Sequence, residues 1–238
     1  MAIRRPPTTF SDSITGADLA SDIAISTTGN IATTGSGTLT SAGAFTASGG
    51  IANAGTITAG TVGSSVVFPA GHVLQVVSAH KSDSQNSSDE FPSGNWTDAT
   101  GLSVSLTPSS ATNYLFMQAN VQGSNRVASF AFATRLYISG GGTDGAILIG
   151  DSEGSRSRVS AGGPNHAATY VLQSYVFGGR IRCNDSTPNW SSGALTIKVQ
   201  FATNNSSNIA QINRAGNESN SSAYTTTSSS LTVMEIKG

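Results

Sequence analysis

Charged side chains are scarce in this sequence. They make up 11% of the 238 residues, and twelve Lys and Arg stand against thirteen Asp and Glu. The cations are scattered, with tight basic pairs such as Arg4 with Arg5 and Arg180 with Arg182 but no larger cluster. Binding to a nucleic acid backbone depends on clustered cations that neutralise successive phosphates. We therefore expect no nucleic-acid partner.

Cysteine and long apolar runs are almost absent as well. Cys183 is the only cysteine, which excludes an intramolecular disulfide, and no Cys or His spacing resembles a zinc site. No apolar run approaches the ~20 residues of a membrane span. The opening MAIRRPPTTF has no apolar stretch behind its arginines. We expect no metal, no cofactor, no membrane insertion and no signal peptide, with assembly in the cytoplasm of the cell that makes the protein.

Residue patterns of catalysis are missing too. The three histidines, His72, His80 and His166, lie in no local Ser/His/Asp or HExxH signature. Such residues can also converge from distant parts of a chain. We nevertheless expect a protein that is not an enzyme, and a polysaccharide depolymerase is the least favoured alternative.

The abundant residues are Gly, Ser, Thr, Asn and Ala, which favour short strands and turns over helices. From residue 69 onward, segments of alternating apolar and polar residues follow one another. In the clearest, LTIKVQF at 195–201, the alternation gives one buried and one solvated face. We predict an all-β protein in which residues 69–238 form a jelly-roll-like β-sandwich head. The expected strands are 73–78, 102–107, 114–121, 130–138, 146–149, 170–177, 195–201, 208–213 and 231–236.

The segment before this head is unusual because residues 23–80 contain no Asp, Glu, Lys or Arg. Its larger apolar residues recur singly, with glycines between them, in steps of 6, 8, 6, 6, 6 and 5. One copy of such a thread buries too little apolar surface to offset the entropy of ordering it. We predict that 23–68 is a short β-spiral or β-helix-like stalk of three identical chains; a disordered linker is the competing interpretation. The predicted core residues of this trimer are Ile25, Ile31, Leu39, Phe45, Ile51, Ile57 and Val62.

Residues 1–22 are predicted to be an attachment segment. Arg4, Arg5, Pro6 and Pro7 form a stiff basic stretch suited to docking on other proteins of a larger particle. An ordinary mobile terminus is the alternative interpretation.

Several runs resemble the tail-fibre-like virion proteins of marine phages. PAGHVLQVV at 69–77, LSVSLTPSS at 102–110 and SLTVMEI at 230–236 look like the C-terminal head of that family. ITGADLASD at 14–22, followed by IAISTTG at 23–29, is similar to its stalk openings. The resemblance implies a homotrimer on the virion, assembled in the bacterial host cytoplasm, with a head like the tumour-necrosis-factor or complement jelly roll. The partners expected for Arg4, Arg5, Pro6 and Pro7 are then other virion proteins of tail, collar or capsid. It carries over no binding residue, and the stalk is shorter than in many phage fibres.

Recognition of a host surface is expected on the connections of the head. Tryptophan beside Asn and Asp is typical of sites that hold sugar rings. The predicted receptor-binding residues, for a host polysaccharide or protein, are Asn95, Trp96, Asp185, Asn189 and Trp190. The alternative interpretation places both tryptophans in the core or a subunit interface. At the level of function, host adsorption is expected first, and a purely structural appendage of collar, head or tail second.

Overall fold

The computed structural model describes residues 68–164, 171–215, 222 and 224–238. The chain divides into two units between Val62 and Gly63, and the described residues belong to the second. The predicted attachment segment, with Arg4 to Pro7, and the predicted stalk core from Ile25 to Val62 lie outside the described residues.

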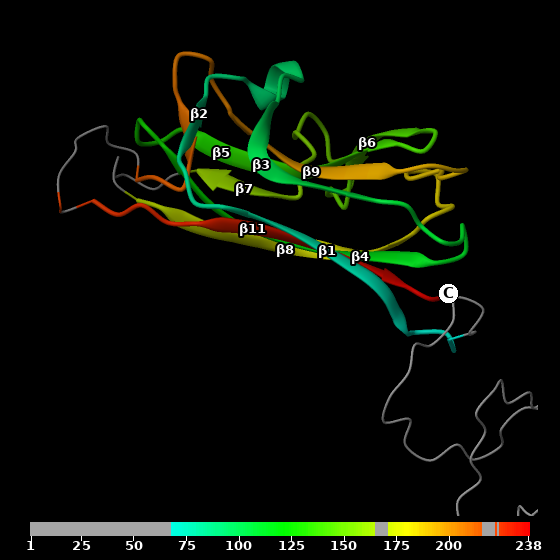
Figure 1. Cartoon of the computed structure of the whole chain (residues 1–238). Coiled ribbons are helices and arrows are strands. Elements are labelled where there is room, and N and C mark those ends of the chain that lie inside the picture. Colours follow the sequence, from blue (N-terminus) through cyan, green and yellow to red (C-terminus); the bar gives the residue numbers. More distant parts are fainter. Residues whose placement is uncertain (1–67, 165–170, 216–221, 223) are drawn as a thin grey trace, which may run out of the picture. The chain divides into compact units, whose positions relative to one another are not determined.

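The second unit is built from two antiparallel sheets, shown in Figure 1. Sheet A has the order β1-β11-β4-β10-β2, with β8 on the other side of β4. Sheet B has the order β3-β9-β5-β6, with β7 also beside β5. The elements are β1 (Val73–Lys81), β2 (Gln85–Ser87), the 3₁₀ turn η1 (Phe91–Ser93), β3 (Thr97–Leu106), β4 (Tyr114–Asn125), β5 (Ala131–Gly140), β6 (Thr143–Ile147), β7 (Ala161–Pro164), β8 (Gln173–Arg182), β9 (Leu195–Thr203), β10 (Ala210–Ile212) and β11 (Ser229–Ile236).

The strand order is that of a jelly roll. When the short strands β2, β7 and β10 are set aside, sheet A runs first, eighth, third, sixth, and sheet B runs second, seventh, fourth, fifth. This order arises when a long hairpin of strands folds over into two facing sheets. The predicted all-β, jelly-roll-like sandwich is therefore confirmed for the described residues.

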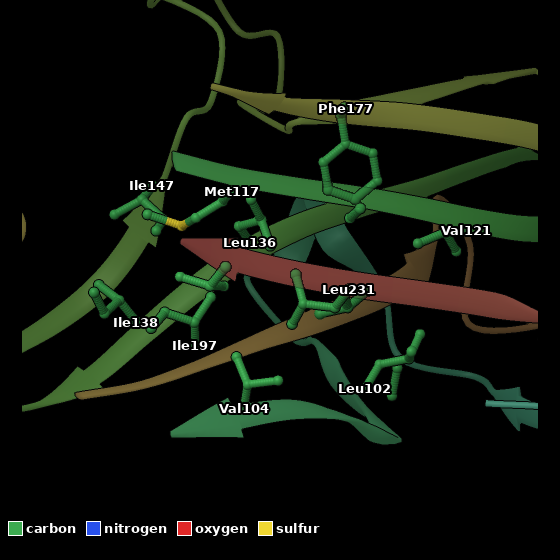
Figure 2. Close-up of a cluster of buried hydrophobic side chains, with 14 of the residues drawn as sticks. Leu102, Val104, Met117, Val121, Leu136, Ile138, Ile147, Phe177, Ile197 and Leu231 are labelled. Carbon is green, nitrogen blue, oxygen red and sulfur yellow. The ribbon is translucent and has the colours of Figure 1, made fainter. Parts of the chain in front are cut away.

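The core lies between the sheets and is formed by every second residue of the long strands (Figure 2). In β9, Leu195, Ile197, Val199 and Phe201 are fully buried, as their alternation predicts. The ring of Phe132 on β5 stacks on Phe201 with its centroid 6.2 Å away. Side chains from both sheets meet in this layer; those labelled in Figure 2 are Leu102, Val104, Met117, Val121, Leu136, Ile138, Ile147, Phe177, Ile197 and Leu231.

Each of the nine predicted strands overlaps an observed strand, and several differ in extent, β6 and β8 for reasons that the backbone shows. β6 ends at Ile147 because Leu148 has a φ of 52°, in the left-handed region that does not continue a strand. β8 continues to Arg182, beyond the predicted end at 177, although Gly178 and Gly179 resemble a turn. At Gly178 a Cβ atom would lie 2.1 Å from the Met117 carbonyl oxygen, so this glycine serves close backbone approach within the sheet.

A buried carboxylate holds the C-terminal strand in place. Glu235 on β11 faces inward and is fully buried. Its Oε1 accepts hydrogen bonds from the Ser109 backbone at 2.7 Å, the Ser109 hydroxyl at 2.9 Å and the Asn113 amide at 2.6 Å. Its Oε2 accepts one from the Gln75 amide at 2.6 Å. Burial alone raises the pKa of Glu235, but these hydrogen bonds outweigh it and hold the pKa below its ordinary value.

We expect Glu235→Gln to lower the free energy of unfolding by about 1–3 kcal/mol at neutral pH, because a neutral amide accepts weaker hydrogen bonds than a carboxylate. The folded-state pKa lies below the ordinary value of about 4.5, which the carboxyl regains on unfolding. The advantage of wild type over the variant is therefore present above that value and lost as pH falls through the folded pKa. Urea denaturation at equal protein concentration from pH 7 to pH 3 measures it.

Glu153→Gln is the matched control, because this carboxylate is 73% exposed in a surface ion pair. It is expected to change the free energy of unfolding by less than about 0.5 kcal/mol. A difference between wild type and Glu235→Gln that stays constant from pH 7 to pH 3 would contradict the stabilising role of the ionised carboxylate.

Candidate functional site

The outward face of sheet B gathers aromatic and charged side chains. Asp98 on β3 pairs in register with Gln200 on β9, and Gln200 pairs with Arg135 on β5. In the adjoining outward row, Lys198 pairs with Tyr137. Because alternate residues share a face, these side chains project to the same side of the sheet. Together with Trp96, which precedes β3, they form what we call the sheet B patch: Trp96, Asp98, Arg135, Tyr137, Lys198 and Gln200.

Trp96 is half-buried at this patch and has contacts on its ring system from its own chain. The Arg135 guanidinium carbon lies 4.2 Å from the centroid of the Trp96 ring, a cation–π arrangement. The Phe91 ring lies 6.0 Å away at an interplanar angle of 33°. A sugar that stacked on the Trp96 face covered by Arg135 would have to displace the guanidinium. Trp96 therefore both positions this cation and offers its remaining surface to a ligand.

The connection that carries Trp96 is held firmly to sheet B. Asp89 accepts a short hydrogen bond from the Thr97 hydroxyl, and its carbonyl accepts one from the Thr203 backbone at 2.9 Å. The 3₁₀ turn η1 ends at Gly94, whose φ of 80° is left-handed and favours glycine. Asn95 is exposed, and its backbone N–H donates to the Glu90 carbonyl at 3.2 Å.

A chain of polar contacts fixes the charged members of the patch. Lys198 Nζ donates to Asp98 Oδ2 at 2.7 Å, and Gln200 Nε2 donates to Asp98 Oδ1 at 2.7 Å. Arg135 Nε in turn donates to Gln200 Oε1 at 2.8 Å. The Arg135 guanidinium also lies 5.2 Å from the centroid of the Tyr137 ring. The order of contact is therefore Lys198, Asp98, Gln200, Arg135, with aromatic rings beside the last.

The titration behaviour of the patch follows from these contacts. Burial raises the pKa of Asp98, but hydrogen bonds from Lys198 and Gln200, and the charges of Lys198 and Arg135, bring it below its ordinary value. A hydrogen bond to the Asp144 carboxylate, with burial, raises the pKa of Tyr137. Burial lowers the pKa of Arg135, yet a guanidinium stays protonated in proteins. At neutral pH the patch therefore holds two cations and the Asp98 carboxylate, with Asp144 at its edge.

The other predicted receptor-binding residues lie elsewhere. Trp190 is half-buried against the core, and its indole N–H donates to the Gly193 carbonyl at 2.8 Å. The ring lies so close to Gly141 that a Cβ atom there would approach it to 2.5 Å. Asp185 is exposed and accepts from the Arg182 backbone at 2.9 Å in the turn after β8, and Asn189 is exposed.

The five predicted residues do not form one site. Trp96 lies at the end of sheet B near Gln200, whereas Trp190 packs beside Gly141, past the Leu195 end of β9. The stretch of β9 from Leu195 to Gln200 spans about 17 Å. Asn95 and Trp96 thus adjoin the sheet B patch, and Trp190 belongs to the packing of the opposite end.

The sequence analysis missed Asp98, Arg135, Tyr137, Lys198 and Gln200 as members of a site. For Arg135, Tyr137, Lys198 and Gln200 the signal was present in part, because alternation in 130–138 and 195–201 assigns them to the solvated faces of two strands. Asp98 lies before the predicted start of its strand at 102. What alternation does not give is that these strands are neighbours.

Groups for other chemistry are not gathered in the described residues. Burial raises the pKa of the Cys183 thiol to about 11, so it stays protonated at neutral pH. Nowhere in residues 68–164, 171–215, 222 and 224–238 do three or more His, Cys, Asp or Glu side chains gather as a metal site would require. That part of the chain also has no helix with the length and apolarity to cross a membrane.

Comparison with known proteins gives likeness to solved structures only. No protein-family model matches the sequence, and no curated protein matches it significantly. A mutant VP2 protein of infectious bursal disease virus in derived T=1 particles is 16% identical to this chain, with a TM-score of 0.38. The match covers 76% of this chain and 41% of the VP2 chain. The Gt strain of that virus gives 15% identity and a TM-score of 0.37, covering 76% and 47%. The chain spans less than half the length of these proteins, and likeness this distant carries no conclusion about assembly or partners.

The different surroundings of the two tryptophans predict different effects of substitution. We expect Trp190→Ala to lower the free energy of unfolding by about 2–4 kcal/mol, because it removes a ring packed on the core. Trp96→Ala is expected to cost about 1 kcal/mol, since it removes mainly the contact with Arg135. Urea denaturation of both variants measures this, and equal losses would contradict the assignment of Trp190 to packing.

Proposed function

We propose that this chain is a homotrimeric fibre or spike protein of a phage virion, attached through its N-terminal segment and presenting its jelly-roll head for adsorption to the host surface. The observation that carries the proposal is the outward face of sheet A. Among the described residues six large hydrophobic side chains are exposed, and four of them, Val73, Val76, Phe116 and Val176, lie on this face. Exposed apolar surface concentrated on one face is typical of an interaction surface.

The apolar residues on this face form continuous rows across the strands. Val76 pairs with Met234, and Met234 pairs with Phe116. In the adjoining outward row, Val73 pairs with Ile236, and Ile236 pairs with Tyr114. The face thus offers an apolar area at the start of β1, where the head follows directly on the predicted stalk. We take its partner to be further copies of the same chain, because a stalk that needs identical neighbours brings their heads together.

The remaining outward residues of sheet A suit burial between copies. On the rows where β1, β11, β4 and β8 pair, the other outward side chains are small or uncharged and polar, apart from His80, Arg180 and Arg182. Both arginines lie on β8 over the Tyr114 ring, with Arg180 at 4.3 Å and Arg182 at 5.0 Å. No carboxylate occupies these rows. A face without acidic residues and with two ring-stacked cations at one side has little charge to desolvate on assembly.

Packing of sheet A between copies would leave sheet B, with its patch, available to a host surface. This division supports adsorption as the function. A purely structural appendage of collar, head or tail is the second outcome to test, because the same assembly would serve it. A polysaccharide depolymerase has no supporting group of residues in the described part of the chain.

We expect the full chain to sediment as a trimer and Val76→Glu to raise its dissociation constant at least tenfold. Because Val76 is exposed, the substitution is expected to leave the head folded, but it requires a carboxylate to be buried at the interface. Ser103→Glu, on the exposed face of sheet B, is the matched control and is expected to leave assembly unchanged. Sedimentation equilibrium decides, and a monomeric wild type or an unaffected Val76→Glu variant would refute the interface.

The virion location is tested by labelling particles with an antibody to the chain and imaging them. Deletion of residues 1–10 is expected to leave trimers that no longer join particles, because the basic, proline-stiffened stretch is removed. Purified full chain is further expected to compete with particles for adsorption to their host cells. Unlabelled particles would reject the virion assignment, and labelled particles without competition would favour the structural appendage over the adsorption protein.

A further inference from the structure

Arg135 stands apart among the cations of the sheet B patch because no carboxylate of the described residues lies within ion-pair distance of it, although the charge of Asp98 acts on it from farther away. Lys198 forms an ion pair with Asp98 at 2.7 Å, whereas Arg135 forms none with any described residue. Its one hydrogen bond runs from Nε to Gln200. Within the described chain, nothing accepts a hydrogen bond from its two terminal nitrogens, which leaves the forked end of the guanidinium free for a ligand.

The position of this guanidinium is fixed before any ligand arrives. The guanidinium carbon lies 4.2 Å from the centroid of the Trp96 ring and 5.2 Å from the centroid of the Tyr137 ring. Gln200, which accepts from Nε, is itself only 7% exposed and is held by Asp98. A cation already ordered by its own protein loses little side-chain entropy on binding, so it is a better recognition element than a free surface arginine.

The charge of the surroundings indicates which anion fits. The two cations, Arg135 and Lys198, are balanced by Asp98 and by Asp144 beside Tyr137. A neutral setting with one unpaired fork suits a single carboxylate, which a guanidinium binds through two parallel hydrogen bonds. Dense polyanions such as sulfated chains or nucleic acid would meet both nearby carboxylates. Those carboxylates and the Asn95 amide can instead hydrogen-bond sugar hydroxyls.

We propose that the sheet B patch binds an acidic polysaccharide whose sugar units carry one carboxylate each, with Arg135 holding the carboxylate. Trp96 and Tyr137 position the guanidinium and offer apolar edges to the sugar ring. This inference rests on the proposed adsorption function, because it names the class of receptor that the head meets. It moves the predicted receptor contact from the connections alone to the outward face of the sheet.

The test is calorimetric titration of the full chain with trigalacturonate. We expect saturable binding, and binding about 10- to 100-fold weaker for Arg135→Gln, because one charge-assisted bidentate contact is lost. Arg135→Lys keeps the charge without the fork and is expected to fall between the two. Arg156→Gln, an exposed arginine paired with Glu153, is the matched control and is expected to bind as wild type. Circular dichroism of each variant checks folding.

Two further probes decide whether the site recognises a carboxylated sugar. The neutral trigalactose is expected to bind at least tenfold more weakly than trigalacturonate, and inorganic sulfate is expected not to compete. Equal binding by the neutral trimer, competition by sulfate, absence of wild-type binding, or unchanged binding by Arg135→Gln would each overturn the proposal.

Adsorption of the same variants to host cells separates this inference from the proposed function. Adsorption by wild type that is lost in Arg135→Gln supports both. Equal adsorption by wild type and by Arg135→Gln keeps the adsorption function and overturns the receptor class. Wild type that binds trigalacturonate but adsorbs to no host cell keeps the carboxylate site and overturns the adsorption function.

Discussion

The position of β11 in the middle of sheet A is the constraint on which the rest of the head depends. The strand lies between β1 and β4, so its alternation sets both the core and the outward face. Leu231 and Val233 point inward, whereas Met234 and Ile236 share the outward side with Val76 and Phe116. A slip of one residue would exchange these faces. Glu235 opposes such a slip, because its four hydrogen bonds come from residues on β1 and from the connection after β3.

The two outward faces of the sandwich carry different kinds of side chains and therefore suit different kinds of binding. Apart from Arg180 and Arg182 at one side, sheet A offers mainly apolar and uncharged side chains, and burial of apolar surface is favourable roughly in proportion to its area. Sheet B offers fixed charges and rings, which add specificity more than area-dependent affinity. In our proposal, one face therefore serves assembly and the other serves recognition. Neither function has to compromise the packing of the core between them.

The sequence predicted strands where alternation is local and gave no prediction where the pattern is short or the contacts are distant. LTIKVQF at 195–201 correctly predicted β9, because four apolar residues at alternate positions fit the period of a strand and not that of a helix. The short β2 and β7 were missed, since three or four polar or glycine-rich residues carry no such pattern. Glu235 received no role from the sequence, and only the donors of Ser109, Asn113 and Gln75, far away in the chain, explain its burial.

The candidate site shows the same division. Trp96 and Trp190 have similar sequence surroundings, with Asn and Asp close by, yet one adjoins a charged patch and the other fills a gap beside Gly141. Arg135 could not be joined to Trp96 from the sequence, because β9, which lies between their strands, comes much later in the chain. Jelly-roll order creates this neighbourhood by folding a hairpin over on itself.

A binding site on the face of a sheet is also more rigid than one on the connections between strands. Its side chains are spaced by the pleat and by the distance between strands, so their geometry changes little when a ligand binds. In the proposed trimer, such a surface would suit a repeating polymer better than a single flexible group, because successive units would meet the same rigid fork on each copy of the chain. Weak contact at one head would then suffice, since three linked heads raise the effective concentration of the remaining sites.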